Sequence, residues 1–207
     1  MKYFDSSRLQ LAIPASTDWT GTEMDPATEN TLFVPQQGSA INQRIGRKVK
    51  VFKIKIRGVI NIAAQSNQTA TDEGNIMRIV LVRDKQTNAS QMQGEQVFGE
   101  LSSNTNSAIT WFQNPDNFGR FDILKDKTFT LQDPNISWDG TNIEQSGLTM
   151  QFKMTHRFKV PIVINFNATN GGNVADIVDD SFHLLANTTS SSLAPTLSYM
   201  CRVSYKE

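Results

Sequence analysis

The chain has 207 residues, 38% of them hydrophobic and 19% charged, and its 20 basic side chains balance its 20 acidic ones. This composition is typical of a folded protein, excludes a disordered one, and fits one substantial domain. The single cysteine, Cys201, excludes an intrachain disulfide and a cysteine-based zinc cluster. No apolar run has the length of a signal-peptide core or of a membrane-spanning helix, so we expect no membrane insertion.

Alternation of apolar and polar residues with a period of two predicts β-strands along most of the chain. The first strand is predicted over residues 8–14, from Leu9, Leu11 and Ile13. Further strands are predicted over residues 47–60, 76–84, 120–131, 148–160, 161–166, 181–187 and 197–205. Helical periodicity is nearly absent, and short helices or turns are expected at most over 94–101 and 173–180. Long polar loops between eight strands indicate an all-β sandwich or jelly roll.

The most unusual segment of this neutral chain is a strongly basic strand between residues 44 and 57. It contains no acidic residue, while the rest of the chain carries 13 basic against 20 acidic side chains. Its seven basic residues are Arg44, Arg47, Lys48, Lys50, Lys53, Lys55 and Arg57. Lysines on an exposed strand discourage edge-to-edge aggregation, but seven exceed that need. Phosphates of a nucleic acid are the partners we expect, with sulfated glycans as the second choice.

The apolar residues of this basic strand change parity in its middle. Val49 and Val51 share one parity, whereas Phe52, Ile54 and Ile56 share the other. One inserted residue near Val51 and Phe52 explains the change, so a β-bulge is predicted, with two short strands at a bend as the alternative. If Phe52, Ile54 and Ile56 face the core, the Lys53, Lys55 and Arg57 side chains share the wet face.

The strand over 148–160 has one apolar face and one basic face. Its apolar set is Leu148, Met150, Phe152, Met154, His156, Phe158 and Val160. Lys153, Arg157 and Lys159 alternate with them and are predicted to support the basic strand over 44–57. His156 and Cys201 both fall on apolar faces, where we expect core residues and not a catalytic pair.

Sequence motifs for chemistry are missing. The chain has no Walker loop, HExxH, GxSxG or CxxC motif, so we expect no catalytic residue, no metal site and no cofactor. Asp176, Asp179 and Asp180 are interpreted as a solvated acidic loop and not as a calcium site, because their spacing matches no EF-hand.

The basic strand is also part of the first of five segments that together resemble a known protein family. It lies within VPQQGSAINQRIGRKVKVFKIKIRGVI (34–60), where a glycine-containing loop leads into RIGRK and then into a strand ending in IRG. Four further segments follow: RIVLVRDKQTN (78–88), NPDNFGRFDILKDKTFTL (114–131), LTMQFKMTHRFKVPI (148–162) and SFHLLANTTSSSLAPTLSYMCRVSYKE (181–207). In this serial order they resemble the capsid proteins of circular single-stranded DNA viruses that encode a rolling-circle replication protein, such as circoviruses, nanoviruses and geminiviruses.

The resemblance implies a single eight-stranded jelly roll, made of two facing four-stranded antiparallel sheets. Residues 1–33 then form an N-terminal segment with the first strand, and residues 34–207 form the capsid core of one domain. It also implies self-assembly into a T=1 icosahedral homo-oligomer of 60 copies around circular single-stranded DNA, without catalysis. The expected location is the virion and the host cell, including its nucleus; no host receptor is identified.

One feature departs from the family's pattern. Its members usually begin with an arginine-rich arm, whereas residues 1–43 hold only Lys2 and Arg8 as basic residues, against five acidic ones. The seven basic residues of 44–57 are therefore the expected nucleic-acid contacts.

Two other hypotheses stay open at this point. One is a capsid protein of a small RNA virus or satellite, with the same fold and assembly. The other is a carbohydrate-binding jelly-roll module, in which Trp19, Trp111 and Trp138 stack on sugars from loops.

Overall fold

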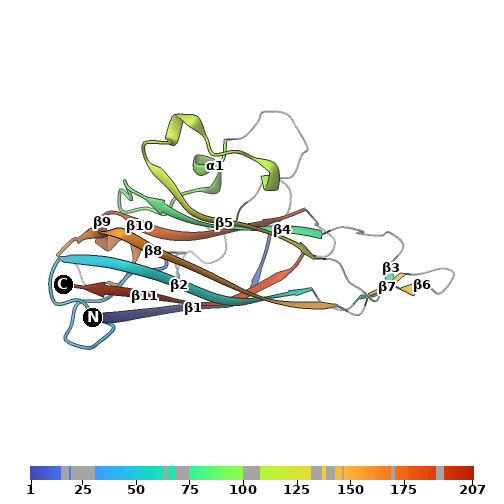
Figure 1. Ribbon diagram of the computed structural model, residues 1–207, viewed down its shortest axis with the longest axis horizontal. Helices are drawn as coiled ribbons and strands as arrows, with labels where there is room; N and C mark the ends of the chain where they lie inside the picture. Colours follow the sequence, from blue (N-terminus) through green and yellow to red (C-terminus); the bar gives the residue numbers. More distant parts are fainter. Residues whose placement is uncertain are drawn as a thin grey trace.

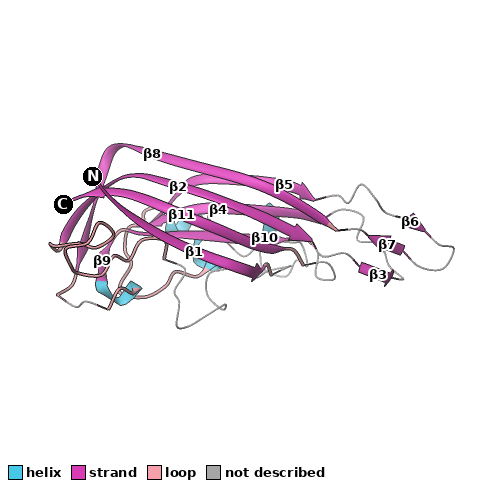
Figure 2. Cartoon of the chain, turned by 90° about the horizontal axis from the view of Figure 1, so that it is seen from below, coloured by secondary structure: helices cyan, strands magenta, loops and turns pink. Residues whose placement is uncertain are grey.

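The computed structural model is a sandwich of two antiparallel β-sheets (Figure 1). It describes residues 1–14, 19, 31–62, 65–68, 75–99, 108–131, 137–138, 143–145, 147–168, 171–189 and 194–207. The N- and C-termini lie side by side at one end of the sandwich, and a small third sheet lies at the other end (Figures 1 and 2).

The larger sheet has five strands in the order β1-β11-β2-β8-β9. Their bounds are β1 Lys2–Ala12, β11 Thr196–Lys206, β2 Lys48–Ile62, β8 Leu148–Phe166 and β9 Ile177–Asp179. The facing sheet has the order β10-β4-β5, with β10 Ser181–Thr188, β4 Asn75–Asp84 and β5 Phe121–Leu131. The small sheet has the order β3-β7-β6, with β3 Gln65–Gln68, β7 Ile143–Gln145 and β6 Ser137–Trp138.

Helices are short in the described part of the chain. They are α1 Gly94–Val97 and the 3₁₀ turns η1 Ala108–Thr110, η2 Pro115–Asn117 and η3 Val174–Asp176. Two of them, α1 and η3, fall within the two segments for which the sequence predicts helices or turns.

This strand order confirms the jelly roll. In the β10-β4-β5 sheet, the segment at Thr31 and Leu32 lies beside β10, in the place of a fourth strand. Thr31 forms an antiparallel bridge with His183, and the N–H of Leu32 donates to the carbonyl of Phe182 at 2.8 Å. The two facing sheets therefore have five and three strands instead of the four each that were expected. The segment at Thr31 makes only one bridge and does not count as a strand, and β9 pairs with β8 as a fifth strand of the larger sheet.

Three predicted strands differ from the structure by more than a residue or two at their ends. The segments 148–160 and 161–166 form one continuous strand, β8. The first strand spans Lys2–Ala12 instead of 8–14, and a register shift between Arg8 and Leu11 leaves Leu9 81% exposed. Its inward side holds Phe4 among polar residues, so the sequence shows no clear alternation there.

The core between the sheets is built from the inward residues of every long strand. Cys201 is fully buried in it, and burial raises the pKa of its thiol to about 12. His156 is half-buried on the inner side of β8, where its Nδ1–H donates to the carbonyl of Leu124 on β5 at 3.2 Å. Cys201 is therefore a core residue, as predicted, whereas His156 lies at the margin of the core and is only half-buried.

A second apolar cluster covers the outer face of the β10-β4-β5 sheet. The connection between β4 and β5 lies over this face (Figure 1), and Trp19 stacks on Phe98 with ring centroids 4.4 Å apart. Arg78 of β4 fixes the connection, because its guanidinium donates to the carbonyls of Ile109 at 2.9 Å and Trp111 at 2.8 Å.

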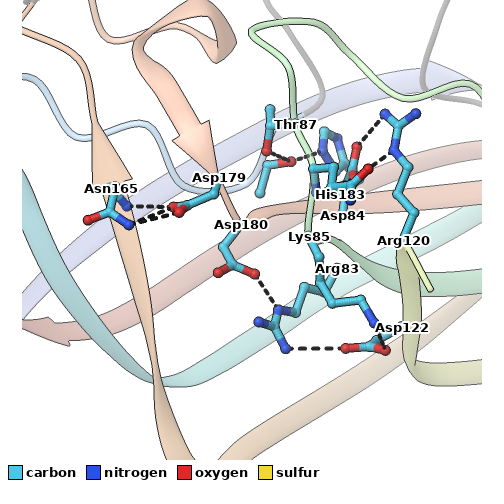
Figure 3. Close-up of polar contacts among 12 residues, drawn as sticks. Arg83, Asp84, Lys85, Thr87, Arg120, Asp122, Asn165, Asp179, Asp180 and His183 are labelled. Carbon is cyan, nitrogen blue, oxygen red and sulfur yellow. Dashed lines mark hydrogen bonds and ion pairs between the residues drawn. The ribbon is translucent and has the colours of Figure 1, made fainter.

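Buried polar side chains join β4, β10 and the start of β5 (Figure 3). Thr87 donates to the Ser181 hydroxyl at 3.0 Å, and the Ser181 Oγ lies 2.7 Å from the Nε2 of His183. Asp84 is fully buried and accepts two hydrogen bonds from Arg120, at 2.9 and 2.8 Å. Burial, only partly offset by Asp84, lowers the pKa of His183 to about 4.

The protein should lose stability as pH falls from about 6.5 to about 4 because of His183. The unfolded chain binds a proton on this imidazole below its ordinary pKa, while the folded protein does not until about pH 4. The loss from this group is on the order of 3 kcal/mol, complete at about pH 4 and absent above pH 7. Urea unfolding at a series of pH values should show that the free energy of unfolding falls more steeply with decreasing pH for the native chain than for His183→Gln. Parallel curves for the two proteins would rule out His183 as the titrating group.

Candidate nucleic-acid interface

The bulge predicted in the basic strand is present in β2. Val51 pairs with Tyr205 and Lys53 pairs with Ser204, so Phe52 is the extra residue between consecutive residues of β11. A bulge of this kind places two residues opposite one and bends the strand. Phe52 and Lys53 both lie on the outer side, whereas Val51 and Ile54 are fully buried. The prediction that Phe52 faces the core is therefore wrong, because Phe52 is itself the inserted residue.

Because the bulge takes up Phe52, the basic side chains of β2 lie on one face. Val49, Val51, Ile54 and Ile56 all point into the core with no exposure. The residues that alternate with them therefore point outward on both sides of the bulge: Lys48, Lys50, Lys53, Lys55 and Arg57. This is the outer face of the five-stranded sheet, the side seen in Figure 2.

Neighbouring strands extend this basic face in register. On β8, Arg157 pairs with Lys53 and Lys153 pairs with Arg57, so both side chains lie on the outer face, as predicted from their alternation. On β11, Arg202 pairs with Lys55 and Lys206 pairs with Lys50. Sequence alone does not group these two β11 cations with the basic strand, because only the pairing of β11 with β2 brings them together. We call the outward side chains of Lys48, Lys50, Lys53, Lys55, Arg57, Lys153, Arg157, Arg202 and Lys206 the basic face.

Positive charge on the basic face is poorly compensated. Asp5 of β1 pairs with Arg202 at 2.5 Å, and no other ion pair joins the basic face to a carboxylate within the described residues. The pKa of Lys55 is lowered, first by Arg57 and then by partial desolvation, Lys153, Lys53 and Arg202. A neighbouring anion would relieve this repulsion.

Arg44 does not belong to the basic face, although the sequence groups it with the other six residues. Its side chain is 1% exposed. Its Nε donates to the carbonyl of Pro35 at 3.2 Å, its Nη1 donates to the carbonyl of Gly46 at 3.1 Å, and its guanidinium lies 4.6 Å from the ring centroid of Phe166. Burial lowers the pKa of Arg44 while nearby Asp176 opposes that shift. Arg44 therefore holds the loop before β2.

Arg47 is the remaining residue of the predicted set. It is exposed just before β2, and its carbonyl accepts the N–H of Phe166 at 2.8 Å. The structure thus brings five of the seven predicted residues together on one face and leaves Arg47 at the entrance of the strand.

The acidic residues considered for calcium are each held by a different partner, as Figure 3 shows for Asp179 and Asp180. Asp179 accepts two bonds from the Nδ2 of Asn165, at 3.1 and 2.8 Å, and Asp180 accepts one from the Nε of Arg83 at 2.6 Å. Asp176 accepts the backbone N–H groups of Gly172 and Asn173. No group of three or more His, Cys, Asp or Glu residues that could hold a metal ion occurs within the described residues.

Two of the three tryptophans proposed for sugar stacking have described side chains. Trp19 and Trp111 are 2% and 4% exposed and pack beneath the connection that covers the smaller sheet, so neither can stack on a ligand. The side chain of Trp138 lies outside the described residues. No helix within the described ranges is long and apolar enough to cross a membrane.

Jelly rolls occur as viral capsid, lectin and cupin domains. A jelly roll whose large sheet carries a basic face with few carboxylates, and whose two visible loop tryptophans are buried, fits the class of viral capsid proteins. The family comparison agrees: residues 21–207 match the model of the geminivirus coat protein/nuclear export factor BR1 family, and the chain belongs to this family. It is a viral coat protein, and this family has a structural role in the virion.

Other comparisons are more distant. Among solved structures, the chain is similar to the VP1 pentamer of human polyomavirus 7, with a TM-score of 0.31 and 9% sequence identity over 99% of this chain and 93% of that chain. No curated protein matches the sequence.

Replacing Arg44 should destabilise the fold, whereas replacing Arg47 should not. Arg44→Gln leaves the carbonyls of Pro35 and Gly46 without their charged donor, at an expected cost on the order of 2–3 kcal/mol. Arg47→Gln removes the same charge from an exposed position and should change stability by less than about 0.5 kcal/mol. Chemical denaturation of both variants measures the difference. Equal stability of the two would contradict the structural role of Arg44.

Proposed function

We propose that this coat protein assembles into a closed shell that encloses a circular single-stranded DNA genome, with the basic face turned toward the DNA. The simplest such shell is a T=1 icosahedron of 60 copies, the closed arrangement of identical subunits that the family resemblance implies. The genome type follows the family's viruses, and passage of the protein through the host nucleus is part of the same proposal.

The observation that carries this proposal is the charge of the basic face. Nine cationic side chains lie on one surface, and Asp5 is their only carboxylate partner in an ion pair within the described residues. Nucleic-acid phosphates are a dense linear array of anions, and contacts with them give binding that does not depend on base sequence. A shell protein that packages a whole genome needs this kind of binding.

A shell around RNA is the second candidate, because phosphate contacts do not distinguish the two nucleic acids. Nuclease treatment of nucleic acid extracted from purified particles separates them. Sensitivity to DNase alone supports the DNA proposal, and sensitivity to RNase alone overturns it in favour of RNA.

The role of the basic face is tested by a triple substitution with a matched control. Lys53→Gln, Lys55→Gln and Arg57→Gln together remove three charges from the centre of the face. They should weaken binding of a single-stranded oligonucleotide and lower the slope of log affinity against log salt by about 2, at roughly 0.7 per lost phosphate contact. Lys85→Gln, Lys125→Gln and Lys127→Gln remove the same charge from the other sheet and should leave the slope unchanged.

Particle assembly distinguishes the competing role of these cations. If they instead pair with acidic groups of a neighbouring subunit, the basic-face triple variant should fail to assemble even without nucleic acid. Sedimentation and negative-stain microscopy of both triple variants measure this. Loss of assembly with an unchanged salt slope would overturn the assignment.

A further inference from the structure

A hollow lies on the basic face at the bulge of β2. It has a volume of about 480 Å³ and is lined by the rings of Tyr3, Phe52 and Phe158 and by the cations Lys53, Lys55 and Arg157. Its volume falls within the range of about 300–1,000 Å³ that is usual for small-ligand sites. The hollow thus combines aromatic surface with positive charge.

The hollow exists because both β2 and β8 are irregular at this point. Val51 pairs with Ile162 and Lys53 pairs with Arg157, so the single residue Phe52 faces a longer stretch of β8. That stretch bows out of the sheet, and Val160 within it is 76% exposed. Phe158 packs against Phe182 of the opposite sheet, with ring centroids 5.6 Å apart, and so lies at the base of the hollow. Phe52 and Tyr3 line the hollow from β2 and β1.

The rings of Tyr3 and Phe52 each have a cation nearby. The guanidinium of Arg202 is 5.8 Å from the ring centroid of Tyr3, and the Nζ of Lys206 is 5.7 Å from that of Phe52. Tyr3 is 41% exposed. Aromatic side chains set in a positively charged groove are the arrangement on which unpaired bases stack, because every base has a flat π-face.

We propose that this hollow binds one unpaired base of a single-stranded nucleic acid. The base stacks against Phe52 and Tyr3, and the phosphates on either side of it contact Lys53 and Arg157. This proposal rests on the proposed function of the basic face and adds to it a preference for single strands. In a duplex the bases already stack on one another, so they are not available to the hollow.

Other occupants fit the hollow less well. A second copy of the chain pairing through the same face would bring like charges together, which opposes association. A free phosphate or a phosphate headgroup would use the cations but leave the three rings without a flat partner. The base is the one group that uses both features.

The test compares two strands of equal charge. The full-length chain, dissociated into subunits, is titrated with a 12-nucleotide oligothymidylate and with a 12-unit abasic strand that has the same phosphates. A base in the hollow should make the thymidylate bind between about fivefold and a hundredfold more tightly, as expected for one stacked base. Phe52→Ala and Tyr3→Ala should each reduce this ratio toward one without changing the salt slope. Phe118→Ala removes a ring that is 55% exposed on the other side of the molecule and should leave the ratio unchanged.

The outcomes separate this proposal from the proposed function. If the native chain binds both strands equally, with a normal salt slope, the basic face still binds phosphates but the hollow is not a base site. If it binds neither strand, the basic face itself is not a nucleic-acid interface. If Phe52→Ala and Tyr3→Ala both keep the full ratio while thermal melting shows that they are folded, the base stacks elsewhere and the proposal is wrong.

Discussion

The bulge at Phe52 decides where every charge of β2 lies. Side chains alternate along a strand, so a shift of one residue moves each later side chain to the opposite face. If Phe52 were instead paired as a regular residue of the ladder, a strand that buries Val49 and Val51 would also bury Lys53 and Lys55, and burial of unpaired ammonium groups is prohibitively costly. With the bulge, four β-branched residues stay in the core and five cations share one surface. The same insertion, opposite the bowed part of β8, leaves the hollow lined by Phe52.

The loop before β2 holds the start of this strand in place. Arg44 is anchored by backbone carbonyls, and the hydroxyl of Tyr205 donates to the carbonyl of Gln43 at 2.7 Å. Tyr3 donates its N–H to the carbonyl of Ile41 at 3.2 Å, so the loop crosses the ends of β1 and β11. Coat proteins need such fixed strand ends because their surfaces must repeat closely in every copy of a shell.

Much of the fold could be predicted from the sequence because most strands bury one face. The alternation in β8 and β11 located both strands, and the parity change in β2 located the bulge. Parity alone cannot say which residue is extra, so Phe52 was predicted on the wrong side. β1 was predicted too short because polar residues surround Phe4 on its inner side. The sequence predicts a new strand beginning at Pro161, yet β8 continues through this residue, because the stretch around Pro161 is not paired with β2 and needs no ladder hydrogen bond there.

The basic face was predictable in part for the same reason. Residues within one strand share a face by simple alternation, which grouped Lys53, Lys55 and Arg57 correctly. Arg202 and Lys206 joined them only through the pairing of β11 with β2, which local sequence does not encode. Arg44 looked like its neighbours in sequence, but its burial depends on Phe166, more than a hundred residues away.

The central claim is that single-stranded nucleic acid lies on the outer face of the five-stranded sheet. Ultraviolet crosslinking of assembled particles, followed by mass spectrometry of the crosslinked peptides, tests it most directly. The account predicts crosslinks in peptides that contain residues 48–57, 153–158 and 200–206. Crosslinks confined to residues 85–99 and 108–120, which cover the other sheet, would contradict it.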